Sequence, residues 1–277
     1  MNTVEVYFIV DNANTAELLV AELAELHFEA FEEVADGVKA FIPQSMFDAP
    51  AIAVIADQYA LPYSVNTIAQ QNWNALWESN FEPLVVNDLQ TGKPWVGVRA
   101  NFHPATEGVD IDIEITPKMS FGTGHHATTY SVMQLMKTVA FNNATVFDFG
   151  TGTGILAILA EKLGAKAVIA VDNDDWCIEN AQENVQKNDC VNISVLKADT
   201  AASVQTFDVV IANINKHILL ENMALLAERT KDGGVLILSG LLIQDEEDIV
   251  SAAEQQGFKH AITLTKGNWI AILLNRS

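Results

Sequence analysis

Over residues 1–70, hydrophobic and polar positions form short runs with two different periods. Val4–Val10 alternates with a period of two and is β-branched, which predicts a strand, whereas residues 14–26 place their leucines near one stripe of a helix. Asp36-Gly37 is a dipeptide typical of a hairpin turn between two strands. A second helical run and a fourth strand-like run complete the order β-α-β-β-α-β. We therefore expect a small α+β domain of the ferredoxin-like type.

Residues 71–91 predict a helix that links two domains. Trp73, Trp77 and Phe81 recur every four residues, so a helix places all three rings on one face. Such a stripe is more typical of packing between a linker and its neighbours than of a ligand platform.

Residues 92–277 are expected to form the second domain. After two short strands, the pattern changes at Lys118 to apolar runs separated by helical segments. These runs are continuously apolar, as in parallel strands buried on both faces. The last two are separated by a short turn and must pair antiparallel. We predict an α/β domain whose doubly wound sheet closes on an antiparallel hairpin, with strands at 145–150, 167–172, 193–199, 207–214, 234–240, 260–267 and 268–275.

Acidic residues dominate the chain and gather in its first third. The formal net charge is −21, and residues 1–88 hold 14 acidic residues against one basic residue, Lys39. A strongly negative field repels nucleic acid and anionic membranes and attracts a basic partner. The same charge is equally compatible with ordinary solubility. We expect a basic protein partner, no direct contact with nucleic acid or membrane, and a monomer.

Cysteine usage and hydropathy indicate a cytoplasmic location. Cys177 and Cys190 are the only cysteines and form no close pair, which suits a reducing compartment. No apolar run approaches the roughly 18–20 residues that cross a bilayer. No basic residue precedes Lys39, so we expect no targeting peptide.

The most informative motif is a glycine-rich loop between two expected strands. Gly150, Gly152 and Gly154 let the backbone turn tightly and let a ligand approach without meeting a Cβ atom. Asp172, at the tip of the next strand, can accept hydrogen bonds from two ribose hydroxyls. The spacing from Gly152 to Ala157 also fits a dinucleotide fingerprint, so two ligand classes share this pattern.

Three features favour S-adenosyl-L-methionine over a dinucleotide. The chain has no separate substrate domain after the nucleotide-binding strands, and its sheet closes on an antiparallel hairpin. Asp199 ends the third strand, where a carboxylate can accept a hydrogen bond from the adenine amino group. Asp199 is equally compatible with a helix cap or a turn acid. Taken together, the features predict a nucleoside bound at the carboxyl ends of the strands.

A second loop, residues 117–126, is glycine-rich and leads into a helix. We expect Thr128 or Thr129 to cap that helix, and its free N–H groups and hydroxyls suit the methionine carboxylate of the cofactor. The adjacent His125 and His126 resemble metal ligands, but neighbouring side chains rarely point at one ion. No metal is expected.

A third loop follows the fourth strand of the second domain, which ends at Asn213. A methyl acceptor needs an amide or carbonyl oxygen that holds its amine in line with the sulfonium, and Asn213 can supply that. We predict Asn213 as the catalytic residue. Desolvation beside a cationic sulfonium favours a neutral amine, so no dedicated base is required. His125, His126 or His217 can relay the proton, although surface or hydrogen-bonding roles are more common for such residues.

Together these motifs resemble the bacterial ribosomal protein L11 methyltransferases (protein methyltransferase A, PrmA type). "FGTGHHATT", "DFGTGTGILAI" with "VDND", "VIANI" and the "NWNALWESNFEPL" linker all have counterparts in that family. The resemblance implies a class I, Rossmann-like methyltransferase domain. It implies cofactor contacts at Thr129, Gly150, Asp172 and Asn213, with Phe121 lining the site.

The resemblance also implies a substrate. The acidic N-terminal domain is expected to recognise basic ribosomal protein L11, whose lysine and terminal α-amines are methylated. The chain departs from the family after Asn213, where Lys216 and His217 replace small residues and are expected to crowd the rim of the acceptor pocket. The alternatives are a methyltransferase of another acceptor, although "NINK" lacks the prolines typical of amide methylation, and a non-catalytic cofactor-binding module for ribosome assembly.

Overall fold

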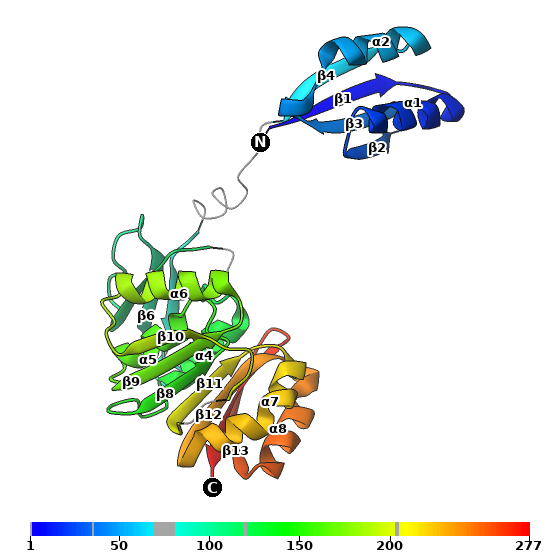
Figure 1. Ribbon diagram of the computed structural model, residues 1–277. Coiled ribbons are helices and arrows are strands. Elements are labelled where there is room, and N and C mark those ends of the chain that lie inside the picture. The colour runs from blue at the N-terminus through cyan, green and yellow to red at the C-terminus, as the bar shows by residue number, and fades with distance from the viewer. Residues whose placement is uncertain (1, 35, 69–80, 119–120, 203–204) are drawn as a thin grey trace. The chain divides into compact units, whose positions relative to one another are not determined.

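The computed structural model describes residues 2–34, 36–68, 81–118, 121–202 and 205–277. The chain divides into two compact units, Met1–Trp73 and Asn74–Ser277, which are described separately here (Figure 1). The expected linker helix cannot be followed over its first part, because Trp73 and Trp77 lie outside the described residues. Within the described residues, no helix is long and apolar enough to cross a membrane.

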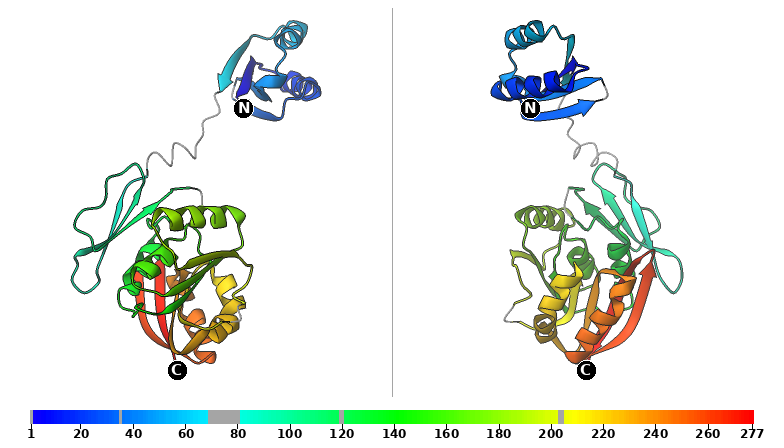
Figure 2. Two further views of the ribbon diagram at one scale, coloured as in Figure 1. Left: turned by 60° about the vertical axis from the view of Figure 1, so that its left-hand side comes forward. Right: turned by 90° about the vertical axis from the view of Figure 1, so that its right-hand side faces the viewer.

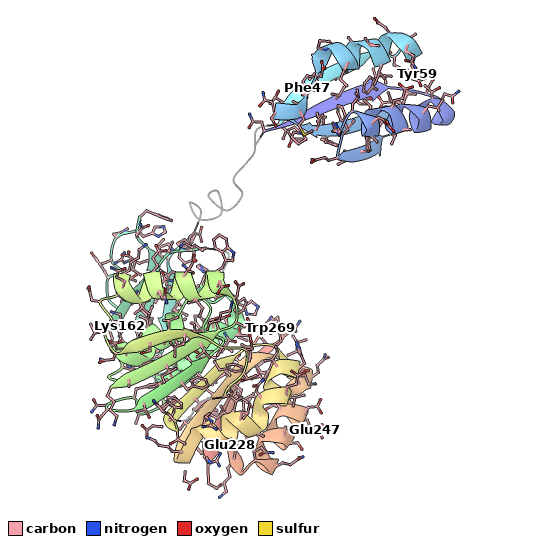
Figure 3. The ribbon with its side chains drawn as sticks, in the orientation of Figure 1. Phe47, Tyr59, Lys162, Glu228, Glu247 and Trp269 are labelled. Carbon is pink, nitrogen blue, oxygen red and sulfur yellow. The ribbon has the colours of Figure 1, made fainter. Side chains whose placement is uncertain are left out.

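Unit 1 is a four-stranded antiparallel sheet with helices on one face. The strand order is β2-β3-β1-β4, and the element order is β-α-β-β-α-β as the sequence predicts. Phe47 and Tyr59 pack against its core (Figure 3). The elements are β1 (Thr3–Ile9), α1 (Ala13–Glu25), β2 (Ala30–Val34), β3 (Gly37–Pro43), η1 (Gln44–Met46), α2 (Ala49–Tyr59) and β4 (Tyr63–Ile68).

Only one face of this sheet is buried. Along β1, Val4, Val6 and Phe8 are buried while the residues between them are partly exposed, because alternate side chains point to opposite faces. All six residues of β4 are exposed. Unit 1 therefore presents a broad, open sheet face and an exposed edge strand to its surroundings.

Unit 2 is built on a seven-stranded sheet with the order β10-β9-β8-β11-β12-β14-β13. Its strands are parallel except β14, which pairs antiparallel with both β12 and β13. The predicted sheet with a terminal antiparallel hairpin is confirmed. The strands are β8 (Thr145–Phe149), β9 (Ala167–Asp172), β10 (Ile193–Lys197), β11 (Phe207–Asn213), β12 (Thr230–Leu242), β13 (Phe258–Lys266) and β14 (Trp269–Arg276).

Helices cover both faces of this sheet. One core contains residues of α4 (Ala127–Met136) and α5 (Ile155–Lys162), and the other contains residues of α7 (Lys216–Arg229) and α8 (Glu246–Gln255). Figures 1 and 2 show α7 and α8, in yellow and orange, together on one face. A short turn, η2 (Ile243–Asp245), precedes α8. Because both faces are covered, six of the seven residues of β11 are buried.

A small three-stranded sheet packs against the core of α4 and α5. Its strands are β5 (Leu84–Asn87), β6 (Pro94–Ala100) and β7 (Ile111–Ile115), in the order β5-β6-β7. Strand β5 corrects the expectation of a helix through residue 91. The run Leu84–Asn87 follows Pro83 and is rich in β-branched residues, and pairing with β6 gives it a ladder partner that a linker helix lacks.

The sheet of unit 2 sets the position of the site. Strands β8, β9 and β11 run in the same direction, so their carboxyl ends meet at one edge. The order of strands reverses between β8 and β11, and a crevice forms there in doubly wound sheets. The loop after β8 carries the glycines, and Asp172 and Asn213 are the last residues of β9 and β11.

Candidate functional site

Three glycines shape the loop between β8 and α5. Gly150, Gly152 and Gly154 have φ angles of 79°, 55° and 80°, in the left-handed region that favours glycine. A Cβ atom on Gly152 would lie 2.2 Å from the carbonyl oxygen of Phe121, and one on Gly150 would lie 2.2 Å from Cγ2 of Ile214. The loop needs glycine at both positions because other segments of the site approach its backbone closely.

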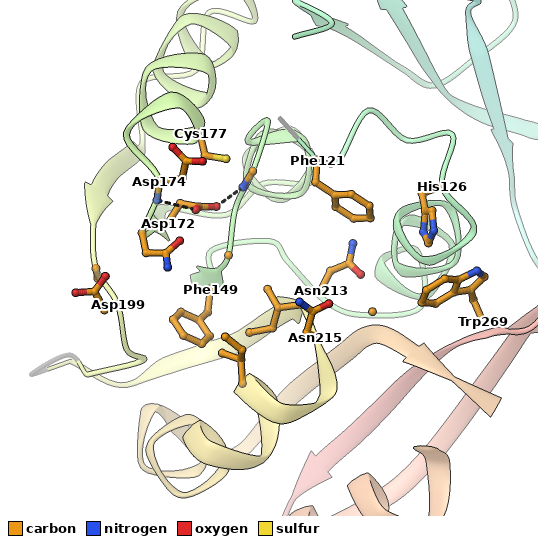
Figure 4. Close-up of a pocket in the computed structure, with 17 residues that line it drawn as sticks. Phe121, His126, Phe149, Asp172, Asp174, Cys177, Asp199, Asn213, Asn215 and Trp269 are labelled. Atoms are coloured by element: carbon orange, nitrogen blue, oxygen red, sulfur yellow. Dashed lines mark hydrogen bonds between the residues drawn. The ribbon is translucent and has the colours of Figure 1, made fainter. Parts of the chain in front are cut away.

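The carboxylate of Asp172 is fixed at the end of β9 by two backbone groups. The Gly152 N–H donates to Oδ2 at 2.9 Å, and the Asp174 N–H donates to Oδ1 at 3.2 Å (Figure 4). Each carboxylate oxygen retains a lone pair for a further donor. Asp199, two residues beyond β10, lines the same cavity. Both predicted carboxylates are thus positioned to accept hydrogen bonds from a ligand.

Another carboxyl group lies inside the core beneath the glycine loop. Asp148 on β8 is fully buried, and its Oδ2 accepts a hydrogen bond from the Thr151 hydroxyl at 2.6 Å. Its Oδ1 has no hydrogen-bond partner within the described residues. Burial raises the pKa of Asp148 from 3.8 to about 7, and the charge of Asp172 adds to the rise. The carboxyl group of Asp148, which is bonded to Thr151 of the glycine loop, therefore changes its protonation state near neutral pH.

These loops border a cavity of about 530 Å³, a size typical of small-molecule sites. Figure 4 shows that its lining has two chemically different ends. Asp172, Asp174, Cys177 and Asp199 gather at one end, where the ring of Phe149 also lies, and the rings of Phe121, His126 and Trp269 gather at the other. Asn213 lies between the two ends. The cavity can therefore hold a polar nucleoside at one end and an apolar chain or amine at the other.

Asn213 ends β11 with one half of its amide engaged. Its side chain is nearly buried, with an exposed fraction of 7%, and its Nδ2 donates to the Thr129 hydroxyl at 3.2 Å. Its Oδ1 is buried and has no partner among the described residues. Thr129 is fully buried and does not line the cavity. Thr129 therefore orients the amide so that the carbonyl oxygen is left as an acceptor.

Three rings form the other end of the cavity. The ring centroids of Phe121 and His126 lie 5.1 Å apart, and those of His126 and Trp269 lie 4.6 Å apart. Burial lowers the pKa of His126, so its imidazole stays largely uncharged at neutral pH. Trp269 was not expected from the sequence. Its position at the start of β14 becomes meaningful only because that strand pairs with β12.

The helix after the histidine loop begins earlier than the sequence predicts. The N-cap of α4 is His126, whose Nδ1 accepts from the Thr128 N–H at 3.4 Å, so neither Thr128 nor Thr129 caps the helix. The Thr128 hydroxyl lies 2.8 Å from the same ring nitrogen and is buried away from the cavity. His125 packs edge-on against Phe81, with ring centroids 4.8 Å apart. Of the two histidines, only His126 lines the cavity.

The residues after Asn213 also differ from expectation. Neither Lys216 nor His217 lines the cavity, which is bordered there by other residues of the same segment, namely Ile214, Asn215 and Ile218. The Lys216 ammonium instead pairs with Asp245 at 3.0 Å and Asp248 at 2.7 Å. Helix α7 begins at Lys216, so positions 214 and 218 face the cavity and positions 216 and 217 do not.

The lining fits an adenosyl group joined to an amino acid. The glycine backbone provides a surface that a Cβ atom would obstruct, and two carboxylates face the polar end. Asn213 lines the cavity between its two ends, and its buried Oδ1 has no hydrogen-bond partner among the described residues. Among the described residues, no group of three His, Cys, Asp or Glu side chains is placed to hold a metal ion.

The fold and the site define a class I, Rossmann-like methyltransferase. A family model described as ribosomal protein L11 methyltransferase (PrmA) matches residues 9–277. The chain therefore belongs to the ribosomal protein L11 methyltransferase (PrmA) family. This membership implies S-adenosyl-L-methionine as the cofactor.

Individual relatives agree with the family assignment. A ribosomal protein L11 methyltransferase of Porphyromonas gingivalis is 41% identical over 92% of this chain and 89% of its own length. One of Phocaeicola vulgatus is 36% identical over 98% of both chains. A crystal structure of ribosomal protein L11 methylase from Lactobacillus delbrueckii subsp. bulgaricus has a TM-score of 0.60 and 31% identity, covering 66% of this chain and 94% of that chain.

Proposed function

We propose that this chain transfers methyl groups from S-adenosylmethionine to lysine side-chain amines and the terminal α-amine of ribosomal protein L11. The observation that carries the proposal is the amide of Asn213, which is buried, oriented by Thr129 and left with a free carbonyl oxygen. An amine N–H that donates to this oxygen is held in one direction. The relatives named above carry the same substrate in their names.

The cofactor lies, in this proposal, with its adenosine at the carboxylate end. Asp172 accepts from the ribose hydroxyls, Asp199 accepts from the adenine amino group, and the backbone of Gly150 and Gly152 gives close approach. Phe121, from the opposite loop, belongs to the ring-lined end of the cavity. When bound, S-adenosylmethionine supplies a methyl group that is activated for attack by a nucleophile.

The residues of the ring-lined end prepare the amine. A lysine amine has an ordinary pKa of about 10.4 and arrives protonated. Transfer into a cavity walled by Phe121 and Trp269 lowers that pKa, because burial penalises the charged form. His126 is held uncharged, and because its Nδ1 accepts the Thr128 N–H, the neutral ring carries its own proton on Nε2, so the proton of the amine leaves to water and not to this ring. Asn213 then keeps the neutral amine aligned.

The acidic N-terminal domain, residues 1–70, binds the basic substrate in this proposal, and the methyltransferase domain that follows it includes β5 (Leu84–Asn87). Supporting this role, residues 1–70 hold 11 acidic residues and one basic residue, Lys39. In this proposal the protein acts as a monomer in the cytoplasm, where ribosomal proteins are made. Long-range attraction of this kind raises the rate of encounter rather than the rate of chemistry.

Mass spectrometry of purified L11 tests the function directly. Incubation with the chain and S-adenosylmethionine should raise the mass of L11 in steps of one methyl group. Asn213→Ala should reduce the rate by about 100-fold or more, because misplacement of a reacting group is costly. Thr129→Val should act in the same direction, and Ser131→Ala on the same helix serves as the matched control. An unchanged L11 mass with tight cofactor binding would instead support another acceptor or a non-catalytic module.

A further inference from the structure

Helix α6 (Asp175–Lys187) and its C-cap carry three asparagines at every fourth position. Asn180 and Asn184 are fully buried, and Asn188 is nearly so. A buried amide costs free energy unless hydrogen bonds replace those that it made with water. The three asparagines must therefore be explained by what they bind.

Two of them replace the missing neighbour of an edge strand. Asn188 accepts from the Glu114 N–H at 3.0 Å and donates to the Glu114 carbonyl at 2.6 Å. Asn184 accepts from the Thr116 N–H at 2.7 Å. Four residues of helix rise about 6 Å and two residues of strand rise about 6.6 Å, so asparagines four apart match alternate residues of β7. Helix α6 thus acts as a side-chain ladder along this edge.

Thr116, just beyond β7, is bonded to α6 through all of its polar groups. Its carbonyl accepts from Asn180 at 3.3 Å, its hydroxyl donates to Glu183 at 2.7 Å, and Lys187 donates to that hydroxyl at 2.6 Å. Burial alone would raise the pKa of Glu183, but hydrogen bonds from Lys118, Lys187 and Thr116 lower it to about 2. The Glu183 carboxylate, which holds Thr116 to α6, therefore stays ionised over the physiological pH range.

Asn184 differs from Asn188 in what its other half binds. Its Nδ2 donates to the carbonyl of Thr153, in the glycine loop, at 2.8 Å. Thr153 in turn holds the loop of Phe121: its N–H donates to the Phe121 carbonyl at 3.0 Å, and its hydroxyl donates to the Gly122 carbonyl at 2.6 Å. The buried amide of Asn184 therefore joins Thr116, at the start of the Phe121 loop, to the glycine loop. Thr153 joins the glycine loop to Phe121 and Gly122, in the middle of the Phe121 loop.

We propose that Asn184, acting through Thr153, is a positioning residue that sets the separation between the two loops of the cofactor cavity. Asn184 does not line the cavity, whereas Gly152 and Phe121 on the two loops do. The inference rests on the proposed function, because these loops are the ones assigned to the cofactor. Asn188 makes equivalent bonds to β7 without reaching the glycine loop, so it performs only the structural half of the same task.

The chemistry of the amide is required at this position. Asn184 needs one acceptor for Thr116 and one donor for Thr153 in the same plane, which asparagine supplies. An aspartate lacks the donor and would put a buried charge against a carbonyl oxygen. A leucine of similar size leaves both backbone groups buried and unpaired.

The test compares Asn184→Leu with its matched control Asn188→Leu in the full chain. Both variants should lower the melting temperature by similar amounts. Only Asn184→Leu should raise the calorimetric Kd for S-adenosylmethionine, by about tenfold or more, while Asn188→Leu should change it less than about threefold. Equal Kd values for the two variants would reduce Asn184 to a structural role and overturn the proposal.

Two further measurements keep the test decisive. If Asn184→Leu does not fold, Thr153→Val should reproduce the loss of affinity and Thr153→Ser, which keeps the hydroxyl, should restore most of it; equal affinities would contradict the proposal. In the ligand-free chain, Asn184→Leu should accelerate hydrogen exchange at the Thr153 amide, and Asn188→Leu should not. That readout decides the role of Asn184 even if the wild-type chain binds no S-adenosylmethionine, a result that would overturn the proposed function alone.

Discussion

The two units of this protein use carboxyl groups in opposite ways. In unit 1, acids such as Glu25, Glu29 and Glu32 lie exposed at the surface of a sheet domain that is covered on one side. In unit 2, Asp148 is fully buried and Asp172 is bonded to two backbone N–H groups at a strand tip. Exposed acids create a field that acts over distance, whereas fixed acids recognise individual hydroxyl and amino groups.

The main sheets of the two units also differ in how much of their surface is buried. Strand β1 alternates buried and partly exposed residues, while β11 is buried almost throughout. A sheet with an open face can meet a large partner, and a sheet covered on both faces offers ligands only the ends of its strands. The contrast agrees with the proposed division, in which unit 1 recognises the partner and unit 2 carries the small-molecule chemistry, and it can be tested one carboxyl group at a time.

The largest effect is expected at Asp148. Because burial raises its folded pKa from 3.8 to about 7, the protonated form stabilises the fold at low pH, and that contribution is lost progressively as pH rises from 3.8 through about 7. The wild-type unfolding free energy should fall by up to about 4 kcal/mol over this window relative to Asp148→Asn. Urea unfolding at several pH values measures it. Glu29→Gln in unit 1 should keep the wild-type dependence of unfolding free energy on pH. If Asp148→Asn also keeps that dependence, burial of Asp148 is not its cause.

The next effect is expected at Asp172. Asp172→Ala removes an acceptor for two ribose hydroxyls and the partner of the Gly152 N–H, so the Kd for S-adenosylmethionine should rise by about 100-fold. Isothermal calorimetry measures it, with Glu247→Ala on the exposed surface of α8 as the control. An unchanged affinity would show that the ribose lies elsewhere.

The smallest effect is expected from the exposed acids of unit 1. Glu29→Lys combined with Glu32→Lys should raise the KM for L11 by about three- to fivefold at low salt and leave both kcat and cofactor affinity unchanged. The same charge change on unit 2, Glu247→Lys with Glu254→Lys, controls for net charge. If both double variants raise KM equally, steering is a property of the whole molecule and not of unit 1.

The parts of the site that follow local rules could be predicted from the sequence. Gly150 and Gly152 have positive φ angles in a tight turn, and Asp172 and Asn213 directly end buried strands, so their places follow from strand periodicity and turn chemistry. The doubly wound sheet of unit 2 and its terminal antiparallel hairpin follow from the same pattern. Strand β5 did not, because a short run after a proline is helical or extended according to the partner that it finds.

Residues that reach the site from distant segments could not be predicted. Trp269 is a single tryptophan in a hairpin, and only the pairing of β14 with β12 carries it to the cavity. Asp148 lies in an apolar run and shows no sign in the sequence of being buried without a second partner. Thr128 and Thr129 were expected to touch the cofactor, and the early start of α4 at Ala127 buries both behind His126 and Asn213.

The insertion of β14 between β12 and β13 has a consequence for biosynthesis. Every other strand of the sheet precedes β14 in the chain, so an emerging polypeptide can assemble the glycine loop and Asp172 before Trp269 has been translated. Strand β13 has no ladder partner in the sheet until β14 arrives. Ribosome-bound intermediates of this protein are therefore expected to lack Trp269 at the ring-lined end of the cavity. We expect the site to be complete only when β14 has inserted between β12 and β13.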